Sequence, residues 1–234
     1  MMKFANNTSS SSGHGAVTGV VCVALAAVVS AMVSLNVALP DIARDTHATQ
    51  TQLLWVIDAY SLVFAALLLP GGALGDRYGR RFALLAGLVI FGVGSALAMA
   101  ASSAAELIAL RSVLGVGAAL VMPATLSTIT GTFPPAERTR AVSMWAAVAG
   151  GAAILGLLAS GLLLAAFSWR SIFGFNVVIA AFALAGTLRF VPESADPDPP
   201  DRDRQPHPTR PSLASVRTGH PTPNQSGGNH GLKR

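Results

Sequence analysis

The sequence predicts an all-α membrane protein built as a bundle of six transmembrane helices. The chain has 234 residues, of which 52% are hydrophobic and only 12% are charged, whereas an ordinary soluble domain carries about 25% charged residues. The few charges gather in short gaps and in the C-terminal tail, and they leave several long apolar windows almost free of charge. Each of these windows is long enough to cross a bilayer.

Composition also divides the chain into three segments. Residues 1–14 are polar and rich in serine and asparagine, and we expect a flexible cytoplasmic lead. Residues 15–191 carry the apolar windows and are expected to form the six-span transmembrane bundle. Residues 192–234 are rich in proline, aspartate, arginine and glycine. A segment of this kind buries too little apolar surface to fold, so a disordered cytoplasmic tail is expected.

The first helix is expected near residues 16–39, because no charged residue occurs between Gly15 and Leu39. Pro40 and Asp41 are predicted to mark its exit from the membrane. Asn36 is its one strongly polar side chain. It either forms a hydrogen bond with a neighbouring helix or faces water in a cavity, and the sequence favours neither alternative.

Five more apolar runs follow, each near the ~20 residues that a bilayer needs. Pro123 should kink the third of them unless a neighbour satisfies the backbone carbonyl that the proline frees. Trp169 lies in a short turn and is expected to anchor the chain at the membrane interface. The runs cover about 53–74, 82–101, 106–131, 141–165 and 172–190.

The placement of the arginines predicts the orientation. Alternate gaps between the apolar runs carry most of them, and the opposite gaps hold only Arg44 and Arg170. Because cytoplasmic loops carry an excess of Lys and Arg, we expect a multi-pass protein of the cell membrane with both termini in the cytoplasm. The formal net charge of +5 could suggest nucleic-acid binding. Because the arginines lie in the gaps between spans and in the tail, membrane topology explains this charge, and we do not expect a nucleic-acid partner.

The gap at 71–81 packs one acid, three arginines and four glycines into eleven residues. Glycines there allow two helices to approach closely and allow a positive φ in a tight turn. The acid can accept hydrogen bonds from a helix N-terminus or pair with an arginine. A topological anchor alone would explain the arginines, but not the acid and the glycines at these spacings. The residues of this cytoplasmic loop motif are Gly72, Gly75, Asp76, Arg77, Gly79, Arg80 and Arg81.

The pattern G-x-L-x-D-R-x-G-R-R in this gap resembles the loop signature of the major facilitator superfamily. Residues 35–42, 107–119 and 167–173 resemble, in the expected order, segments of its fourteen-span drug/proton antiporter branch. The resemblance implies half of a major facilitator fold, the N-terminal six helices. It also implies proton-coupled efflux of a small organic compound by alternating access, with no enzymatic activity, no cofactor and no metal.

Two positions depart from the antiporter pattern. In the fifth helix, Leu157 and Ser160 replace a proline and a glycine of the family motif, so a proline-dependent bend is in doubt. In the first helix, Ala31 stands where many relatives carry an acid. The glycines expected to pack helices against each other are Gly115, Gly117, Gly150, Gly151, Gly156 and Gly161.

Asp58 and Arg111 are the candidates for proton coupling. Both lie about five residues inside their helices from the same side, which is roughly 7–8 Å deep at 1.5 Å per residue. A charge at this depth is costly unless it is paired or faces water. We therefore predict that Asp58 is the protonatable group with Arg111 as its charge partner, the alternative being a static structural ion pair.

A second function of another class is also open. The tail loses all apolar periodicity, as an out-of-frame reading of the gene would, so the chain would be a truncated or frameshifted half-transporter with no transport activity alone. It would then act at most as a membrane interaction module. The expected partners are the lipid bilayer, a small-molecule substrate and protons, together with either a missing C-terminal half or a second copy in a homodimer.

Overall fold

The computed structural model describes residues 8–191, with side chains described from residue 15. The chain forms helices α1 (Thr8–Thr46), α2 (Gln50–Tyr78), α3 (Arg80–Met99), α4 (Ala104–Thr132), α5 (Arg138–Ala166) and α6 (Arg170–Phe190), with a short 3₁₀ turn η1 (Pro135–Glu137) before α5. In this part of the chain six helices are long and apolar enough to cross a membrane. The predicted all-α, six-helix bundle is therefore confirmed.

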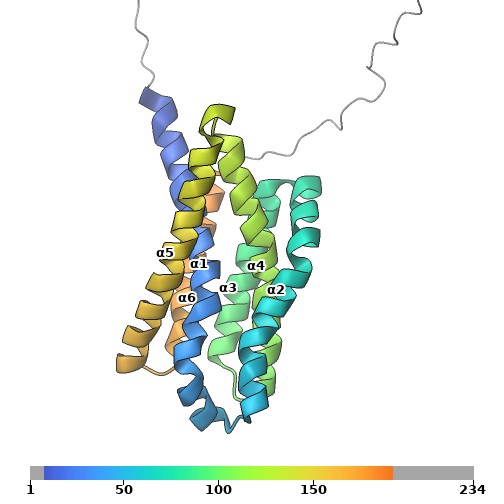
Figure 1. Ribbon diagram of the computed structural model, residues 1–234, viewed down its shortest axis with the longest axis vertical. Coiled ribbons are helices and arrows are strands. Elements are labelled where there is room, and N and C mark those ends of the chain that lie inside the picture. The colour runs from blue at the N-terminus through green and yellow to red at the C-terminus, as the bar shows by residue number, and fades with distance from the viewer. Residues whose placement is uncertain (1–7, 192–234) are drawn as a thin grey trace, which may run out of the picture. The chain divides into compact units, whose positions relative to one another are not determined.

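The helices run up and down the bundle in alternation. Figure 1 shows α2 and α5 at two sides of the bundle, with α1 and α4 between them and α3 and α6 behind. The most extensive contacts join α4 to α2 and α3, and join α1 to α5. We call the end where α2, α4 and α6 finish the basic end, because Arg77, Arg80, Arg81, Arg138, Arg140 and Arg189 lie there; the other is the opposite end.

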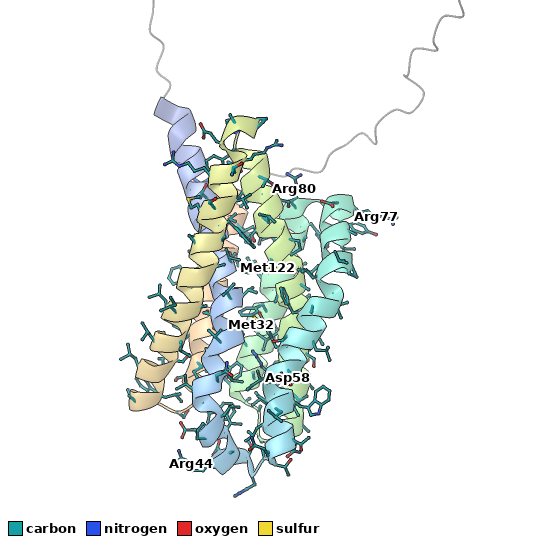
Figure 2. All side chains as sticks on the ribbon, viewed as in Figure 1. Met32, Arg44, Asp58, Arg77, Arg80 and Met122 are labelled. Carbon is teal, nitrogen blue, oxygen red and sulfur yellow. The ribbon has the colours of Figure 1, made fainter. Side chains whose placement is uncertain are left out.

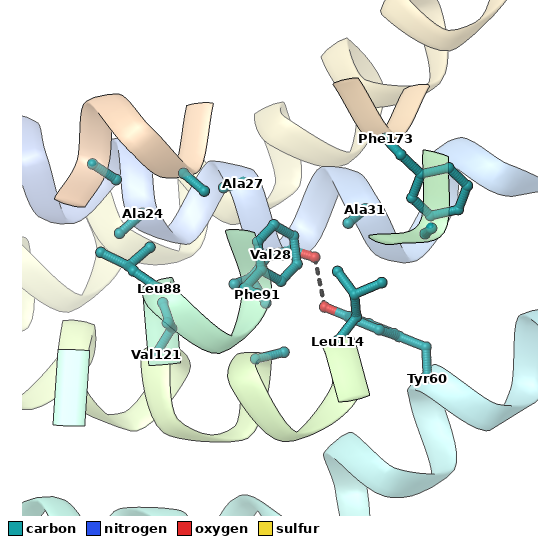
Figure 3. Close-up of a cluster of buried hydrophobic side chains, with 14 of the residues drawn as sticks. Ala24, Ala27, Val28, Ala31, Tyr60, Leu88, Phe91, Leu114, Val121 and Phe173 are labelled. Carbon is teal, nitrogen blue, oxygen red and sulfur yellow. Dashed lines mark hydrogen bonds between the residues drawn. The ribbon is translucent and has the colours of Figure 1, made fainter. Parts of the chain in front are cut away.

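The core lies among α1, α3, α4 and α6, and α2 adds Tyr60 to it. Figure 3 shows small side chains of α1, such as Ala24 and Ala31, facing Leu88 and Phe91 of α3 and Leu114 of α4. Small residues let these helices approach closely, which is how helices gain packing energy in a membrane without a hydrophobic driving force between them.

The helices extend further than the apolar runs predict. α1 begins at Thr8, inside the predicted flexible lead, and continues through Pro40 to Thr46. Beyond Pro40, the Asp41–Arg44 ion pair and the bond from Arg44 Nε to the Pro40 carbonyl support the last turn. The predicted bounds of this helix, about 16–39, are therefore too short at both ends. The rest of the predicted lead (residues 1–7) and the predicted tail (192–234) lie outside the described residues.

The predicted turn at 71–81 shrinks to one residue. α2 runs through most of the motif to Tyr78, and α3 begins at Arg80. Gly79 alone breaks the helix, with φ of 100°, a conformation that L side chains rarely adopt. The motif is therefore mainly helical surface, with a glycine as its hinge point.

Pro123 lies inside α4, and Gly71 of α2 packs beside the carbonyl that this proline frees. A proline cannot donate to the carbonyl four residues earlier, which here belongs to Ala119. A Cβ built on Gly71 would lie 2.5 Å from that carbonyl oxygen, so α2 reaches it only because position 71 has no side chain. A close Cα–H contact of this kind partly compensates a carbonyl that lost its helical partner.

Candidate functional site

Arg111 of α4 is the largest side chain that is fully buried, with 1% of its surface exposed. Its Nε donates a hydrogen bond to the Val56 carbonyl of α2, and its Nη1 donates to the Ala31 carbonyl of α1, both at 3.1 Å. Its Nη2 has no hydrogen-bond partner among the described residues. Arg111 therefore connects three helices through backbone carbonyls rather than through an acid.

Tyr60 of α2 completes this connection. Its ring lies under the guanidinium, with Arg111 Cζ 4.4 Å from the ring centroid, so the ring face contributes a cation–π interaction in a dry environment. Its hydroxyl donates to the Val28 carbonyl of α1 at 2.8 Å, which Figure 3 marks as a dashed line. We call Arg111, Tyr60 and the carbonyls of Val28, Ala31 and Val56 the arginine node.

Asp58 does not join the arginine node. Its side chain is exposed, and no salt bridge links it to Arg111 in the described part of the chain. The reason is helical phase: Val56 and Tyr60 lie one turn apart on the face of α2 toward Arg111, whereas Asp58 is rotated by about 200° from either of them. Equal depth is therefore not sufficient for the expected ion pair, and the pair is not formed.

Asn36 of α1 does not form the hydrogen bond with a neighbouring helix that was one of its two predicted alternatives. Its amide Nδ2 donates at 3.0 Å to the Val33 carbonyl of its own helix, and its side chain is exposed. In Figure 2, Met32 and Asp58 mark the neighbouring stretches of α1 and α2. The bundle therefore exposes an amide on α1 and a carboxylate on α2 within its spans.

At the basic end, two arginines of the motif bind other helices. Arg80 Nη1 donates to the Ser127 carbonyl of α4, and Arg81 Nη2 donates to the Leu188 carbonyl of α6, both at 3.1 Å. Arg77 lies over the ring of its neighbour Tyr78, with Cζ 5.5 Å from the centroid. The motif therefore fastens the start of α3 to the ends of α4 and α6.

Asp76 and Gly72 lie beside these arginines but face elsewhere. The Asp76 carboxylate is exposed and, among the residues that the structure describes, accepts no hydrogen bond and forms no ion pair. Gly72 lies against Pro123, since a Cβ built on it would be 3.6 Å from the proline Cβ. Gly75 packs against Ala83 at 3.3 Å, measured from such a Cβ. In the described structure the acid of the motif is therefore not paired with the motif's arginines, two of which bond to α4 and α6.

At the opposite end, α1 and α6 are joined by a cluster that the sequence did not predict. Asp45 Oδ2 accepts hydrogen bonds from Trp169 Nε1 at 3.0 Å and from Arg170 Nη1 at 2.7 Å. Arg170 Nη2 also donates to the Ala101 carbonyl after α3. Trp169 is only 2% exposed, so its indole lies inside the end of the bundle and the interfacial anchor predicted for it is wrong.

Three of the six expected packing glycines make close helix contacts. A Cβ on Gly115 would lie 2.7 Å from the Tyr60 carbonyl oxygen, one on Gly117 2.8 Å from that of Gly87, and one on Gly156 2.5 Å from Ser30 Cβ. The other three have open space where a Cβ would be, because they lie on other faces of α5 than Gly156. Those three are Gly150, Gly151 and Gly161.

Two sets of residues were missed from the sequence, and only the second had a usable signal. Tyr60 shares the face of α2 with Val56, one turn away, but which face of α2 lies toward Arg111 depends on tertiary packing. Asp45 and Arg170 are opposite charges in gaps on the same side of the membrane, which makes them natural partners. No group of three or more His, Cys, Asp or Glu residues that could hold a metal is found between residues 8 and 191.

Comparison with known proteins supplies the family. The family model of the Major Facilitator Superfamily matches residues 19–222. The chain is 42% identical over 162 residues to the methyl viologen resistance protein SmvA of Salmonella typhimurium, a match that covers 69% of this chain and 33% of SmvA. It is 44% identical over 166 residues to the multidrug efflux pump LfrA of Mycolicibacterium smegmatis, covering 70% of this chain and 33% of LfrA.

The fold also matches solved transporters. The inward-open structure of the xylose transporter XylE from E. coli superimposes with a TM-score of 0.65 and 19% identity, covering 77% of this chain and 48% of XylE. The predicted half of a major facilitator fold is thereby confirmed. The chain spans about a third of the length of the curated relatives that it matches.

Proposed function

The chain belongs to the Major Facilitator Superfamily, and from this premise we propose that it forms the six-helix half of a transporter that moves a small organic compound out of the cell. Transporters built from repeats hold their substrate near the bilayer midplane between the two repeats, which rock against each other. The names of two relatives, the methyl viologen resistance protein SmvA and the multidrug efflux pump LfrA, support an exported organic compound.

The observation that carries this proposal is the exposed carboxylate of Asp58 inside a membrane span. Asp58 lies in α2 (Gln50–Tyr78), about five residues after the apolar run begins at Leu53, which is roughly 7–8 Å along the helix. A carboxylate at this depth is too costly in contact with lipid tails, so it must face a water-filled cavity or another protein surface. An aqueous pathway lined by α2 meets this requirement.

We further propose that Asp58 exchanges the coupling proton. An exposed carboxylate in an aqueous cavity can take up a proton on one side of the membrane and release it on the other. Arg111 does not contact Asp58. It is held by backbone carbonyls and by Tyr60 in the arginine node, and in this proposal it keeps α1, α2 and α4 in register around the cavity. The role of Arg111 is therefore positioning rather than direct charge pairing.

The proposed orientation follows from the arginines at the basic end. Six arginines lie there, against Arg44 and Arg170 at the opposite end. The positive-inside rule then assigns the basic end, and with it both termini, to the cytoplasm. We propose the cell membrane as the location, as expected for an exporter.

A second candidate function is that of a half-transporter that works only with a partner. Large apolar side chains of α2 and α5 are exposed, among them Leu69 at 83% and Leu162 at 75%. Lipid covers some of this surface, but a transport pathway that lies between two bundles requires a second six-helix bundle. A missing C-terminal half or a second copy in a homodimer would supply it; without either, the chain would be a membrane interaction module.

Reconstitution of the purified chain into proteoliposomes tests these alternatives. We expect exchange of radiolabelled methyl viologen across the membrane, and uphill transport when a proton gradient is applied. Crosslinking in the same vesicles reports whether the active species is a monomer or a homodimer. If no exchange occurs with or without crosslinked dimers, the half-transporter interpretation stands and transport by this chain is rejected.

Asp58→Asn separates the proton step from folding. Asparagine imitates the protonated acid, so this variant should retain exchange without a gradient and lose uphill transport, whereas Asp58→Glu should retain both. Glu137→Gln, which removes an exposed acid at the basic end, is the matched control. Unchanged uphill transport in Asp58→Asn would reject the proposed coupling residue.

A further inference from the structure

A pocket of about 440 Å³ lies at the opposite end, between the last turns of α1 and the turn that joins α5 to α6. In Figure 2, Arg44 marks this end, away from Arg77 and Arg80. A volume of this size is typical of sites for small molecules. Neither Asp58 nor Asn36 lines the pocket, so it is separate from the proposed transport pathway.

Two acids and two arginines line this pocket as two ion pairs. Asp41 pairs with Arg44 one turn along α1, and Asp45 pairs with Arg170 of α6. All four side chains are exposed or partly exposed. Their charges cancel, so the pocket presents both signs with no net charge.

Both carboxylates keep one oxygen for a ligand. Asp45 Oδ2 accepts the bonds from Trp169 and Arg170, and Asp41 Oδ1 accepts the bond from Arg44. The other oxygen of each carboxylate has no hydrogen-bond partner among the described side chains and backbone. Arg44 uses Nε and Nη2 within α1, which leaves its Nη1 free over the same described range. The pocket therefore offers acceptors to a cation and a donor to an anion.

The rest of the pocket is largely apolar and lies at the membrane interface. Leu164, near the end of α5, and the exposed ring of Phe167 line it. Leu162 continues this exposed apolar surface along α5 toward the middle of the bundle. The charges of α1 come just after an apolar run that ends at Leu39, at the level where headgroups meet acyl chains. A ligand with a charged head and an apolar body suits this arrangement.

The charges and rings of the pocket favour one kind of head. A purely anionic head would meet the two carboxylates, whereas a head with both charges can use all four side chains. A quaternary ammonium prefers a cage of aromatic faces. Trp169 cannot supply one, because it is 2% exposed and carries the Arg170 guanidinium 4.5 Å from its ring centroid. A primary ammonium instead has three N–H donors for the free carboxylate oxygens.

We propose that this pocket binds the headgroup of an ethanolamine phospholipid, with Arg44 holding the phosphate and the carboxylates of Asp41 and Asp45 holding the ammonium. The chemistry recognised is a phosphate diester linked to a primary ammonium. The bilayer is its source, because the apolar wall of Leu164 and Phe167 accommodates the start of the acyl chains. Assignment of the lipid to the outer leaflet rests on the orientation proposed above, whereas the binding chemistry does not.

Lipid retention by the purified 234-residue chain tests the site. The chain is reconstituted with equal amounts of dioleoyl phosphatidylethanolamine and dioleoyl phosphatidylcholine and extracted in mild detergent, and the lipids that remain bound are quantified by mass spectrometry. We expect the ethanolamine lipid to be preferred about tenfold, the ratio that one hydrogen bond to a charged group implies. Lipids with a mono- or dimethylated ammonium keep an N–H donor and should lie between the two.

Two variants separate the two charges of the head. Asp41→Asn should reduce the preference for ethanolamine severalfold, because it weakens an acceptor for the ammonium. Arg44→Gln should reduce the total amount of both lipids and keep the preference, because both carry the phosphate. The pair is exposed, so neither change should lower the midpoint of thermal unfolding much. Glu106→Gln, which removes an exposed acid at the same end but outside the pocket, is the matched control and should change neither quantity.

Four results would overturn the proposal. The first is equal retention of the two lipids, or a preference that Asp41→Asn leaves unchanged. The second is equal retention of dioleoyl phosphatidylglycerol, which would show that the arginines alone recognise the head. The third is thermal stabilisation by soluble glycerophosphoethanolamine as large as that by the lipid at the same concentration, which would assign the pocket to a soluble ligand. The fourth is a disulfide between two copies of a Ser168→Cys, Cys22→Ala chain in ethanolamine lipid, which would show that a second copy occupies the pocket.

Lipid retention and transport fail independently. Retention needs no proton gradient, no exported compound and no second bundle, so it tests the pocket even if the chain transports nothing. Loss of the ethanolamine preference in Asp41→Asn with unchanged methyl viologen transport would support the lipid site and leave the proposed function intact.

Discussion

The middle of the bundle and its basic end use the same bond in different surroundings. At the arginine node, Arg111 donates to the carbonyls of Val56 and Ala31; at the basic end, Arg80 donates to Ser127 and Arg81 to Leu188. All four N···O distances are 3.1 Å. Hydrogen-bond geometry therefore does not distinguish the two regions, whereas burial does.

Burial changes what these bonds contribute. Water cannot replace the partners of Arg111, which is 1% exposed, so breaking its bonds leaves a charge in a low-dielectric interior. Arg80 and Arg81 are only partly buried, and water or lipid headgroups can replace their partners. The lesson is that the depth of an arginine in this bundle, more than its bond count, determines how strongly the fold depends on it.

The largest expected loss of stability comes from separating α2 and α4 at Gly115, where their close contact allows the arginine node to form. Gly115 lies one turn after Arg111, and a Cβ there would lie 2.7 Å from the Tyr60 carbonyl oxygen. Gly115→Val should therefore separate α2 from α4 and prevent a stable bundle, a loss of several kcal/mol. The measurement is the yield of monodisperse protein and its midpoint of thermal unfolding in detergent.

Gly150→Val is the matched control, because a Cβ at Gly150 meets nothing within 4 Å. It adds the same side chain to α5 at a site facing open space and should unfold within a few degrees of the unaltered chain. If the two variants behave alike, the close approach of α2 and α4 is not what holds the arginine node.

The second largest loss of stability is expected when Arg111 itself is replaced. Arg111→Ala leaves a large cavity and deletes two interhelical hydrogen bonds, and we expect a loss of about 3–5 kcal/mol. Arg111→Met fills most of the space without the charge, and its loss should be smaller, because the Val56 and Ala31 carbonyls keep their bonds within their own helices. Unfolding in a denaturant series would measure both variants. Equal losses would mean that charge and hydrogen bonds, rather than packing, dominate at this position.

The smallest effect is expected at the basic end. Arg80→Ala removes one partly buried hydrogen bond and should cost about 0.5–1 kcal/mol. Arg77→Ala, with no interhelical bond in the described structure, is the control and should cost less. Thermal unfolding of the two variants side by side provides the measurement. A loss at Arg80 as large as that at Arg111 would contradict the view that burial decides the contribution.

The sequence was sufficient for the number, order and type of the helices, because span length and charge distribution alone require them. The ends were less predictable: α1 continues past Pro40 because Asp41 and Arg44 support its final turn, a local interaction that hydropathy does not report. The ordered motifs were sufficient for the family. They carry information in fixed spacings that survive changes elsewhere in the chain.

The candidate site was only partly predictable, and the missing information was rotation about the helix axis. Depth can be counted along a chain, so Asp58 and Arg111 were placed at matching levels. Which side of α2 faces α4 depends on tertiary packing, and that packing turns Tyr60 toward Arg111 and Asp58 away. The glycines of α5 show the same limit: Gly156 contacts Ser30, while Gly161 faces open space.

The single-residue connection at Gly79 has a consequence for how α2 and α3 move. The two helices are joined with no slack, since one ends at Tyr78 and the other begins at Arg80. A shift of one helix along its axis therefore pulls on the other, because no loop between them can extend. Arg80 and Arg81, directly after this joint, bond to α4 and α6. The joint thus couples any axial movement of α2 to the helices that hold the start of α3.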